Sequence, residues 1–596
     1  MFRKWLEENK AEKFDFSGTL FPRASDREYW DGKKDDEFIT SAEKYLDYEW
    51  PSIKATDYIE LNKSGSRVAQ EKPHFARRYA FVALVMAELC EYKGRFIPDI
   101  VNGIFAMCEE TFWGLSAHVY YFDKGISLPP ADGEWIDLFA AETAATLVNA
   151  CYLLEDELRD YCPEIIDRVE YEIERRIRKP YMTHIEWTWQ GYFRKVNNWN
   201  PWILSNILNV FLLTEKNKSR LANAINKMLR EINAIYDEYP EDGGCDEGPS
   251  YWMVSGASLF DFIDIIYLAT NGKINFFEDT KIKNIAEFIL KAYIGNYYFV
   301  NFADGPVRMK IASAYSVYKF GQRIGNENLS RLAKEMSPEN SGDAPEVSRD
   351  AKLRRTVYGL MYKDDILSQS ELSKDRKDAV LPDIQTAYLR AGDFFLAAKG
   401  GHNKENHNHN DVGSFMVFCE NKPVLVDAGV GTYTKFTFSP KRYEIPAMQS
   451  AYHNLPLVNG VMQKDGMNFA ADKFEVCGKT VNISFAGAYP EEAGLKTLDR
   501  SITLSDSGID CTDTFVFTDD NKVAEHFMTP LSVKIDGDSV VLDDKYKLTV
   551  KGATVSTDIM HFDGDMKFVS VWNCEYLTRI KFELNSDKIE ISLRRI

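Results

Sequence analysis

Three of the nine histidines in this chain fall between His402 and His409, shortly before an apolar run that begins at Phe415. That run predicts a buried strand. If the strand begins a few residues early, His407, His409 and Asp411 share one face, because side chains alternate along a strand. We therefore expect one wall that carries several protonatable or metal-binding groups.

A second acid and another imidazole follow close to the next apolar segments. Asp427 ends the apolar run 423–426, and His453 precedes the apolar run 455–458. A carboxylate that enters a core needs a partner. Two imidazoles and a carboxylate suit a zinc ion, so His409, Asp427 and His453 are candidate zinc ligands. Ordinary polar groups at strand ends would show the same spacing, and this alternative stays open.

Two stretches nearer the N-terminus carry polar and aromatic residues in patterns that suit a sugar site. The first places Asn197, Asn198, Trp199, Asn200 and Trp202 around a proline at the start of a helix. Such amides could simply cap the helix. They could also bind sugar hydroxyls or a carboxylate while the indoles stack on the rings.

The second stretch, 242–252, is rich in glycine, contains Glu247 and leads into a helix that begins near Tyr251. Tyr251 would then face whatever this loop surrounds. A core aromatic with a bonded hydroxyl group is the alternative interpretation.

Composition excludes several classes of protein. The net charge of -19 argues against nucleic-acid binding, which needs a basic surface. The first ten residues lack the apolar core of a signal peptide, and we find no run of about 18 apolar residues, so we expect a cytoplasmic protein outside the membrane unless an export signal was trimmed. The nine scattered cysteines favour reduced thiols.

The spacing of apolar residues changes along the chain. Residues 1–345 show apolar residues three and four positions apart, which predicts helical hairpins stacked into a solenoid or a closed toroid. Residues 346–380 begin within a segment rich in turn residues and are expected to link two domains. Residues 381–596 alternate apolar and polar side chains, which predicts an antiparallel β-sandwich. The fold class expected is therefore a multidomain α+β protein with a binding cleft between its halves.

Together these motifs resemble the heparinase II/III-like superfamily of polysaccharide lyases. The resemblance rests on Asn-Asn-Trp-Asn and Asp-Gly-Gly-x-x-Glu-Gly-x-x-Tyr in the helical half. In the β half it rests on His-x-His-x-Asp-x-Gly-Ser-Phe, Val-Asp-x-Gly and His-Asn. It implies an (α/α) toroid followed by a β-sandwich, and a lyase acting on uronate-containing glycans.

The resemblance also implies roles for individual residues. Tyr251 and His407 would be catalytic, and Asn197 or Asn198 would neutralise the uronate carboxylate. His409, Asp427 and His453 would hold a structural Zn²⁺ in the β-sandwich. The candidate substrate-binding residues are Trp199, Asn200, Trp202, Glu247, His402, Tyr433, Arg442 and Tyr443.

The chemistry explains these residue types. Removing the C5 proton of a uronate places charge on the adjacent carboxylate, so a hydrogen-bond donor must face it. A base takes the proton and an acid protonates the leaving O4. Tyr251 could do both, or His407 could be the base and Tyr251 the acid.

We therefore expect a lyase that cleaves an acidic oligosaccharide or polysaccharide and leaves a 4,5-unsaturated uronate. Glycosaminoglycans such as heparan sulfate, chondroitin or hyaluronan are favoured over alginate. The acidic surface fits oligosaccharides better than a long polyanion. A glycoside hydrolase that uses Asp137, Glu142, Asp246 or Glu247 is the main alternative. A non-catalytic carbohydrate-binding protein is the third.

Overall fold

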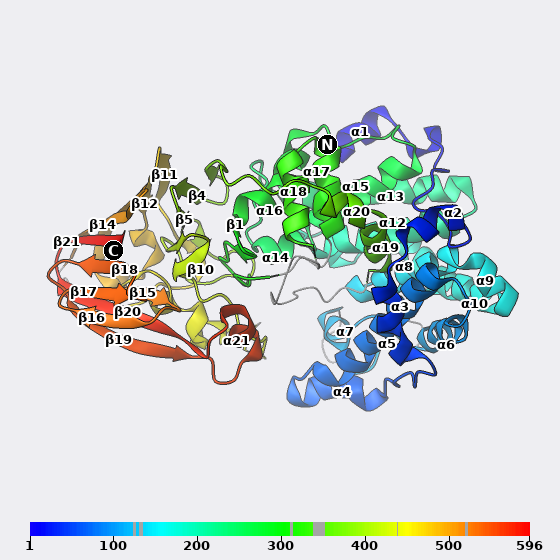
Figure 1. The fold of residues 1–596 in the computed structure, drawn as a ribbon, viewed down its shortest axis with the longest axis horizontal. Helices are drawn as coiled ribbons and strands as arrows, with labels where there is room; N and C mark the ends of the chain where they lie inside the picture. The colour runs from blue at the N-terminus through cyan, green and yellow to red at the C-terminus, as the bar shows by residue number, and fades with distance from the viewer. Residues whose placement is uncertain are drawn as a thin grey trace.

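Figure 1 shows a computed structural model of the chain, which describes residues 1–122, 127–129, 135–309, 314–337, 352–434, 436–437, 439–518 and 522–596. A helical half and a β half lie beside each other along the longest axis of the molecule. Helices come first in the sequence and antiparallel strands follow, which confirms the predicted fold class.

The helical half contains helices of very different lengths and one short β-hairpin. Its α-helices are α1 (Phe2–Glu8), α2 (Arg27–Trp30), α3 (Asp36–Ala42), α4 (Ala55–Ser64), α5 (Val68–Glu91), α6 (Ile97–Cys108), α7 (Ser116–Phe122), α8 (Leu138–Leu153), α9 (Glu155–Tyr161), α10 (Pro163–Ile173), α11 (Lys179–Thr183), α12 (Trp199–Thr214), α13 (Lys218–Glu238), α14 (Pro249–Trp252), α15 (Gly256–Ala269), α16 (Thr280–Ala292), α17 (Ala314–Ile324), α18 (Glu327–Glu335), α19 (Leu353–Met361) and α20 (Lys363–Leu367). The hairpin consists of β1 (Tyr293–Gly295) and β2 (Tyr298–Phe299).

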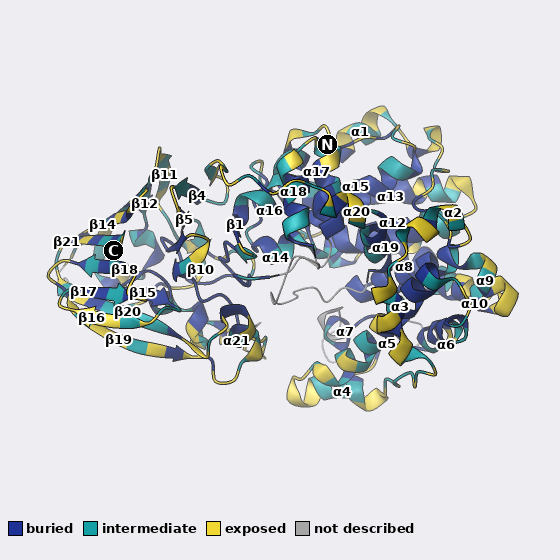
Figure 2. Cartoon of the chain, viewed as in Figure 1, coloured by how far each residue is buried: buried dark blue, intermediate teal, exposed yellow. Residues whose placement is uncertain are grey.

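The inner helices of this half form a closed ring. Helix α8 contacts α12, α12 contacts α15, α15 contacts α17, α17 contacts α19, and α19 returns to α8. Helices α8, α12 and α15 are buried on nearly every side (Figure 2), as expected for helices that are apolar all round. Polar side chains start the long helices: Asp137 accepts a hydrogen bond from the Ala140 N–H at the start of α8. The ring agrees with the predicted toroid.

The structure corrects the expected linker. Helices α19 and α20 occupy residues 353–367, within the range 346–380 that the sequence analysis assigned to a linker. Arg354 and Arg355 of α19 both pair with the buried carboxylate of Asp261 in α15, at 2.9 and 2.8 Å. These ion pairs hold α19 in the ring. Residues 346–351 lie outside the described residues.

One stretch is long and apolar enough for a membrane span, although the sequence analysis found no such stretch. Residues Pro249–Ala269, which cover α14 and α15, are long and apolar enough to cross a membrane by composition alone. In the fold, 78% of the relevant window is buried. The core helices of globular domains commonly have this composition, and α15 belongs to the inner ring.

The β half contains strands β3 to β21 and one helix. The strands are β3 (Ala379–Leu381), β4 (Thr386–Ala391), β5 (Phe394–Lys399), β6 (His402–Asn403), β7 (Phe415–Cys419), β8 (Lys422–Leu425), β9 (Pro456–Val458), β10 (Gly466–Ala470), β11 (Lys473–Cys477), β12 (Thr480–Ser484), β13 (Leu495–Ser505), β14 (Gly508–Phe517), β15 (Lys522–Thr529), β16 (Val533–Asp536), β17 (Ser539–Leu542), β18 (Tyr546–Val550), β19 (Thr554–His561), β20 (Tyr576–Asn585) and β21 (Lys588–Arg595), and the helix is α21 (Met566–Trp572).

These strands form a sandwich. An eight-stranded sheet in the order β11-β12-β13-β14-β21-β18-β17-β16 supplies one layer. The other layer combines the five-stranded sheet β3-β4-β5-β7-β8 with the four-stranded sheet β19-β20-β15-β9, and the Val426 N–H donates to the Met528 carbonyl between them, at 2.9 Å. The chain crosses between the layers from β20, which pairs with β15, to β21, which pairs with β14.

A buried arginine ties the sandwich core to two loops of the β half. Arg500 is fully buried and makes two hydrogen bonds to Asp513, at 2.8 and 2.5 Å. It also donates to the Gly413 and Asn454 carbonyls, at 2.9 and 2.8 Å. Asn454 in turn donates to carbonyls at the ends of β7 and β8. This network positions the segments that follow His409 and His453.

We predict that Arg500→Leu lowers the free energy of unfolding by about 3 to 5 kcal/mol, because it leaves the buried carboxylate of Asp513 without its partner. Urea unfolding measures this change. The control is Arg594→Leu, which removes a partly exposed arginine paired with Asp510, and it should cost less than about 1 kcal/mol. Equal losses in the two variants would contradict the prediction.

Candidate active site

Asp304 lies at the centre of the candidate site, and sequence reasoning missed it. Its buried carboxylate accepts hydrogen bonds from His407 Nδ1 at 2.8 Å and from His409 Nε2 at 3.0 Å. Tyr433 Oη and Arg442 donate at 2.9 and 2.6 Å. Asp304 comes from the loop after β2 in the helical half, and its four partners come from the β half.

These contacts determine the charge of Asp304. Burial alone would raise the pKa of its carboxyl group. The hydrogen bonds from His407 and His409 and the positive charge of Arg442 instead hold that pKa well below its usual range. Asp304 is therefore a carboxylate at neutral pH.

The strand expected to carry His407, His409 and Asp411 is not present. Strand β7 begins at Phe415, and residues 404–414 form a loop in which His407 has a left-handed backbone, with φ of 55°. His407 and His409 converge on Asp304, whereas Asp411 accepts a hydrogen bond from the buried Lys399 at 2.7 Å. The shared wall exists, but loop geometry rather than strand alternation creates it.

Tyr251 faces His407 as the resemblance implied. Their rings stack with centroids 4.2 Å apart, and Tyr251 Oη lies 2.7 Å from Tyr433 Oη. Because Tyr433 gives its only hydroxyl proton to Asp304, the proton between the two phenols belongs to Tyr251. Burial raises the pKa of Tyr251 well above its ordinary value, so its hydroxyl group is neutral.

A glycine sets the position of Tyr251. Gly248 adopts a φ of 92° immediately before α14, a conformation that favours glycine. The turn lets the Tyr251 and Trp252 N–H groups bond the Gly248 carbonyl, both at 3.2 Å. Trp252 points into the core and donates to the Ile285 carbonyl at 2.6 Å, so the neighbouring Tyr251 is held toward the β half.

The two candidate asparagines lie in different environments. Asn198 is buried and donates to Glu247 Oε2 at 2.8 Å. Asn197 is exposed, and its side-chain oxygen accepts the Trp199 N–H at 3.2 Å. Burial raises the pKa of Glu247 to about 6, although the nearby His407 lowers it. Asn198 and Glu247 therefore belong to the same electrostatic neighbourhood as His407.

A cleft of about 890 Å³ opens between the two halves beside this cluster. We call it the interdomain cleft. Among the predicted residues, its lining includes Asn197, Asn198, Trp199, Glu247 and His402. Asn406, next to His407, also lines it. The volume falls in the range of about 300 to 1,000 Å³ that is typical of ligand sites.

The structure does not bring every predicted residue to this cleft. Asn200 is buried and donates to the Trp189 and Glu231 carbonyls, and Trp202 is buried and donates to Glu142. Both therefore stabilise the helical half, contrary to the substrate-binding role expected. Arg442 is buried as well, and it donates to Asp304 and to three backbone carbonyls, so it positions the His407 loop.

Two further predicted residues lie at partly buried positions. Tyr443 accepts a hydrogen bond from Asn408 at 3.0 Å, which places its hydroxyl group against the loop that carries His407. Trp199 lines the cleft, and its ring lies 4.5 Å from the ring of His118.

The proposed zinc ligands come together. One ligand atom from each of His409, Asp427 and His453 lies within 4.8 Å of the others, and all three residues are buried. In the described part of the chain, His409 Nδ1 and His453 Nε2 have no hydrogen-bond partner. Buried imidazole nitrogens without partners, beside a carboxylate, fit the donor set that a zinc ion prefers.

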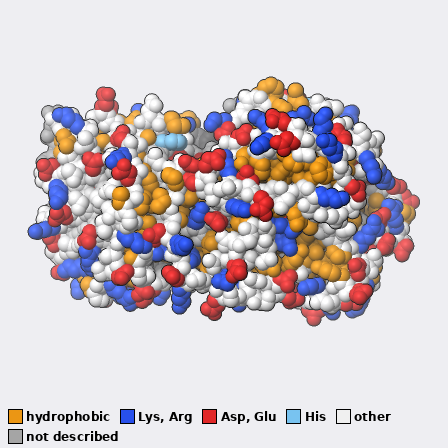
Figure 3. Space-filling model, turned by 90° about the horizontal axis from the view of Figure 1, so that it is seen from above, with side chains coloured by type: hydrophobic (Ala, Val, Ile, Leu, Met, Phe, Trp, Pro, Cys, Tyr) orange, Lys and Arg blue, Asp and Glu red, His pale blue; other side chains and the backbone are white. Residues whose placement is uncertain are grey.

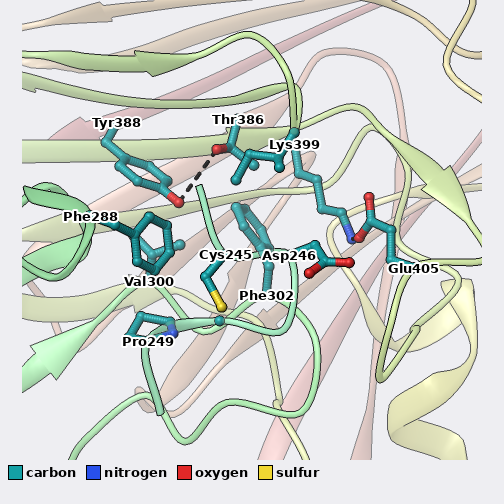
Figure 4. A pocket seen from close by; sticks show the side chains of 12 residues that line it. Cys245, Asp246, Pro249, Phe288, Val300, Phe302, Thr386, Tyr388, Lys399 and Glu405 are labelled. Carbon is teal, nitrogen blue, oxygen red and sulfur yellow. Dashed lines mark hydrogen bonds and ion pairs between the residues drawn. The ribbon is translucent and has the colours of Figure 1, made fainter. Parts of the chain in front are cut away.

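A much smaller cavity of about 20 Å³ lies between the halves near the interdomain cleft (Figure 4). Cys245, Pro249 and Phe302 from the helical half face Tyr388 and Lys399 from the β half. This volume holds about one water molecule. The two halves are therefore closely packed against each other at this point, between the interdomain cleft and the interior of the protein.

Comparisons with known proteins agree with this geometry. Residues 373–569 match the family model described as Heparinase II/III-like, C-terminal. A crystal structure of heparinase III has 13% sequence identity and a TM-score of 0.64, over 94% of this chain and 85% of that chain. Heparan sulfate lyase HepC from Pedobacter heparinus has 12% identity and a TM-score of 0.57, over 100% and 87%.

A mutant of chondroitin AC lyase from Streptomyces coelicolor A3 gives 10% identity and a TM-score of 0.50, over 96% of this chain and 82% of that chain. No curated protein matches the sequence. Residues 373–569 are thus similar to the heparinase II/III-like C-terminal family, and the chain as a whole has a fold similar to that of these solved structures. The resemblance inferred from the motifs is confirmed.

We predict that Glu247→Gln stabilises the protein at pH 7 relative to pH 4. The folded-state pKa of about 6 lies above the ordinary value of 4.5, so wild-type stability falls as pH rises between these values. About 1.4 kcal/mol per pKa unit gives a loss of about 2 kcal/mol. Glutamine does not ionise and avoids this loss. Urea unfolding at both pH values measures it.

The control is Glu238→Gln, which replaces an exposed carboxylate in the same cleft. Its effect on the free energy of unfolding should be nearly the same at both pH values. A Glu247→Gln effect that is also independent of pH would contradict the prediction.

Proposed function

We propose that this protein is a polysaccharide lyase that cleaves uronate-containing oligosaccharides by β-elimination. The observation that carries the proposal is the stack of Tyr251 on His407, which Asp304 holds. These residues do not themselves line the cleft, but Asn406, next to His407, and Glu247, whose pKa His407 lowers, do line it, and the cleft is large enough for a sugar. An acid, a base and an amide donor lie within one neighbourhood, and the fold matches that of structures named as heparan sulfate and chondroitin lyases.

Asn198 is the better candidate for neutralising the uronate carboxylate. It lines the cleft, it is buried, and Glu247 fixes its side chain. A preorganised donor in a site shielded from water stabilises developing charge more strongly than an exposed one. Asn197 is exposed and already bonds the backbone at the start of α12.

The protonation states favour a division of labour between Tyr251 and His407. Tyr251 holds its proton because burial raises its pKa, so it suits the acid that protonates the leaving O4. Asp304 faces Nδ1 of His407, which places the proton there and leaves Nε2 as the base for the C5 proton. Both groups act from one wall, which suits a uronate whose C5–H and O4 lie on the same face, as in glucuronate.

The charges of the cleft bear on the substrate. The lining includes the carboxylates of Glu238, Asp246, Glu247, Asp383 and Glu405 but only two lysines, Lys195 and Lys404. Lys195 already pairs with Glu238 at 3.1 Å. A densely charged polyanion would meet repulsion here. Short glycosaminoglycan-type oligosaccharides with few charges fit better, and alginate oligosaccharides are the alternative.

The hydrolase alternative has less support. Asp137 bonds the backbone at the start of α8 and Glu142 bonds Trp202, both buried in the helical half. Only Asp246 and Glu247 line the cleft. These two are adjacent in sequence, so a pair of acids on opposite sides of a glycosidic bond is not evident among them.

We also propose that His409, Asp427 and His453 hold a Zn²⁺ ion. Such an ion would tie the loop of His409 to the end of β8 and to the segment before β9. Its role would be structural, because it would fix the wall that carries His407.

We predict that the protein releases products with the ultraviolet absorbance of a 4,5-unsaturated uronate from a panel of uronate oligosaccharides. Glucuronate-containing members should react faster than iduronate-containing ones. Tyr251→Phe should lower turnover by about 10² to 10⁴, the usual contribution of a general acid or base, with an unchanged melting temperature. The control is Tyr171→Phe, which changes an exposed tyrosine of α10 in the helical half and should keep wild-type turnover.

Reducing ends without ultraviolet absorbance would indicate hydrolysis and would exclude the lyase. Full turnover by Tyr251→Phe would remove this residue from the mechanism.

We predict one zinc ion per chain in the purified protein and loss of that ion in His453→Gln. Elemental analysis by mass spectrometry measures the zinc directly, without reference to activity. The variant should also melt at a lower temperature, because metal binding contributes to folding. His561→Gln, which changes a histidine on the exposed strand β19, should retain the metal. A wild-type protein without zinc, or a His453→Gln variant that keeps it, would contradict the assignment.

A further inference from the structure

A second pocket, of about 510 Å³, lies where the two halves meet and is separate from the residues of the interdomain cleft. We call it the junction pocket. The β1–β2 hairpin and the end of α18 line it from the helical half. Residues 371–376 and the turns after β4 and β7 complete it. Acidic and basic side chains are mixed over the face of the molecule shown in Figure 3.

Two arginines lie side by side in the junction pocket. Arg376 donates to the Tyr293 carbonyl at 2.5 Å and also to the Ile294 carbonyl, and Arg390 donates to the same Tyr293 carbonyl at 2.7 Å. Arg376 lies over the Tyr293 ring and Arg390 over the Phe395 ring, at 5.2 and 4.6 Å. Two guanidinium groups that share one acceptor must be close neighbours.

Neither guanidinium group forms an ion pair within the described residues. The nearby carboxylates are engaged elsewhere: Asp378 pairs with Lys479 at 2.7 Å, and Arg595 pairs with both Asp393 and Glu420. Glu335 bonds the hydroxyl group of Tyr293. Glu371 is exposed at the rim. The lining thus carries four basic and four acidic side chains, but none of these carboxylates pairs directly with Arg376 or Arg390 in the described residues.

A buried hydrogen-bond donor without a partner is a second, independent observation. The Nε atom of Arg376 is buried and has no partner in the described structure. An orphaned donor of this kind in a native fold commonly marks an ion or water that completes the site. Two like charges close together are also costly without an anion between them. Burial and the charge of Arg376 lower the pKa of Arg390 to about 9, in agreement with this cost.

We propose that the junction pocket binds an oxyanion, a sulfate, phosphate or carboxylate group, between Arg376 and Arg390. The planar guanidinium fork matches two oxygens of such a group, which makes arginine the preferred residue for sulfate and phosphate recognition. The bound anion would join the β1–β2 hairpin to strand β4 and to residue 376. The site does not depend on lyase activity, and it can be measured without turnover.

Calorimetry on the full chain tests this site with inorganic sulfate and phosphate, against chloride at equal ionic strength. We expect one sulfate or phosphate per chain. Arg376→Gln and Arg390→Gln should each weaken binding at least tenfold. The control Arg594→Gln changes a partly exposed arginine outside the pocket and should leave sulfate and phosphate binding unchanged. A sulfated monosaccharide that binds tenfold tighter than sulfate would identify a glycan group as the ligand, and equal affinities would identify the free anion.

A second measurement avoids any variant that fails to fold. Phenylglyoxal modifies accessible arginines, and mass spectrometry maps the modified sites in the wild-type protein. Sulfate should protect Arg376 and Arg390 while Arg594 reacts as before. The proposal fails if sulfate and phosphate bind no better than chloride, if both glutamine variants keep wild-type affinity, or if sulfate protects neither arginine.

Discussion

The carboxylate of Asp304 is the interaction on which the candidate site depends. Burial would make this charge very costly if it stood alone. Four donors from the β half satisfy it: two imidazoles, a phenol and a guanidinium group. Because Asp304 belongs to the helical half, its charge also holds the loops of the β half against the ring of helices. One acid thus aligns the site and joins the two halves.

The same carboxylate sets two imidazoles in opposite tautomers. A charged acceptor keeps a proton on each nitrogen that faces it. His407 faces Asp304 with Nδ1, whereas His409 faces it with Nε2 and has no hydrogen-bond partner for Nδ1 in the described residues. The first arrangement suits a base that faces a substrate, and the second suits a ligand that faces a metal. Neighbouring histidines of one motif therefore acquire different chemistry from a single partner.

The sequence predicts features that depend on residues close together in the chain, and it misses features that depend on residues far apart in the chain. Spacing of three and four residues predicted a helical half, and alternation predicted a β-sandwich after it, because both patterns are local. Asp304 has no such signal: it lies in an irregular loop and meets its partners across more than 100 residues. The strand expected at 407–411 failed because His407 and Gly413 adopt left-handed backbones, with φ of 55° and 88°. The motif indicated which chemical groups the site contains, and the loop determines how these groups are arranged.

The β1–β2 hairpin connects Asp304 with the arginines of the junction pocket. After β2, the Phe299 N–H bonds the Val307 carbonyl at 2.7 Å, which closes the loop that presents Asp304. Before the turn, the Tyr293 carbonyl of β1 holds Arg376 and Arg390. The negative charge at one end is fully met by donors of this chain. Among the described residues, the guanidinium groups of Arg376 and Arg390 donate to carbonyl oxygens. These oxygens carry partial charge and balance a cation less well than a carboxylate does. This difference separates a site completed by the fold from one that an external anion would complete.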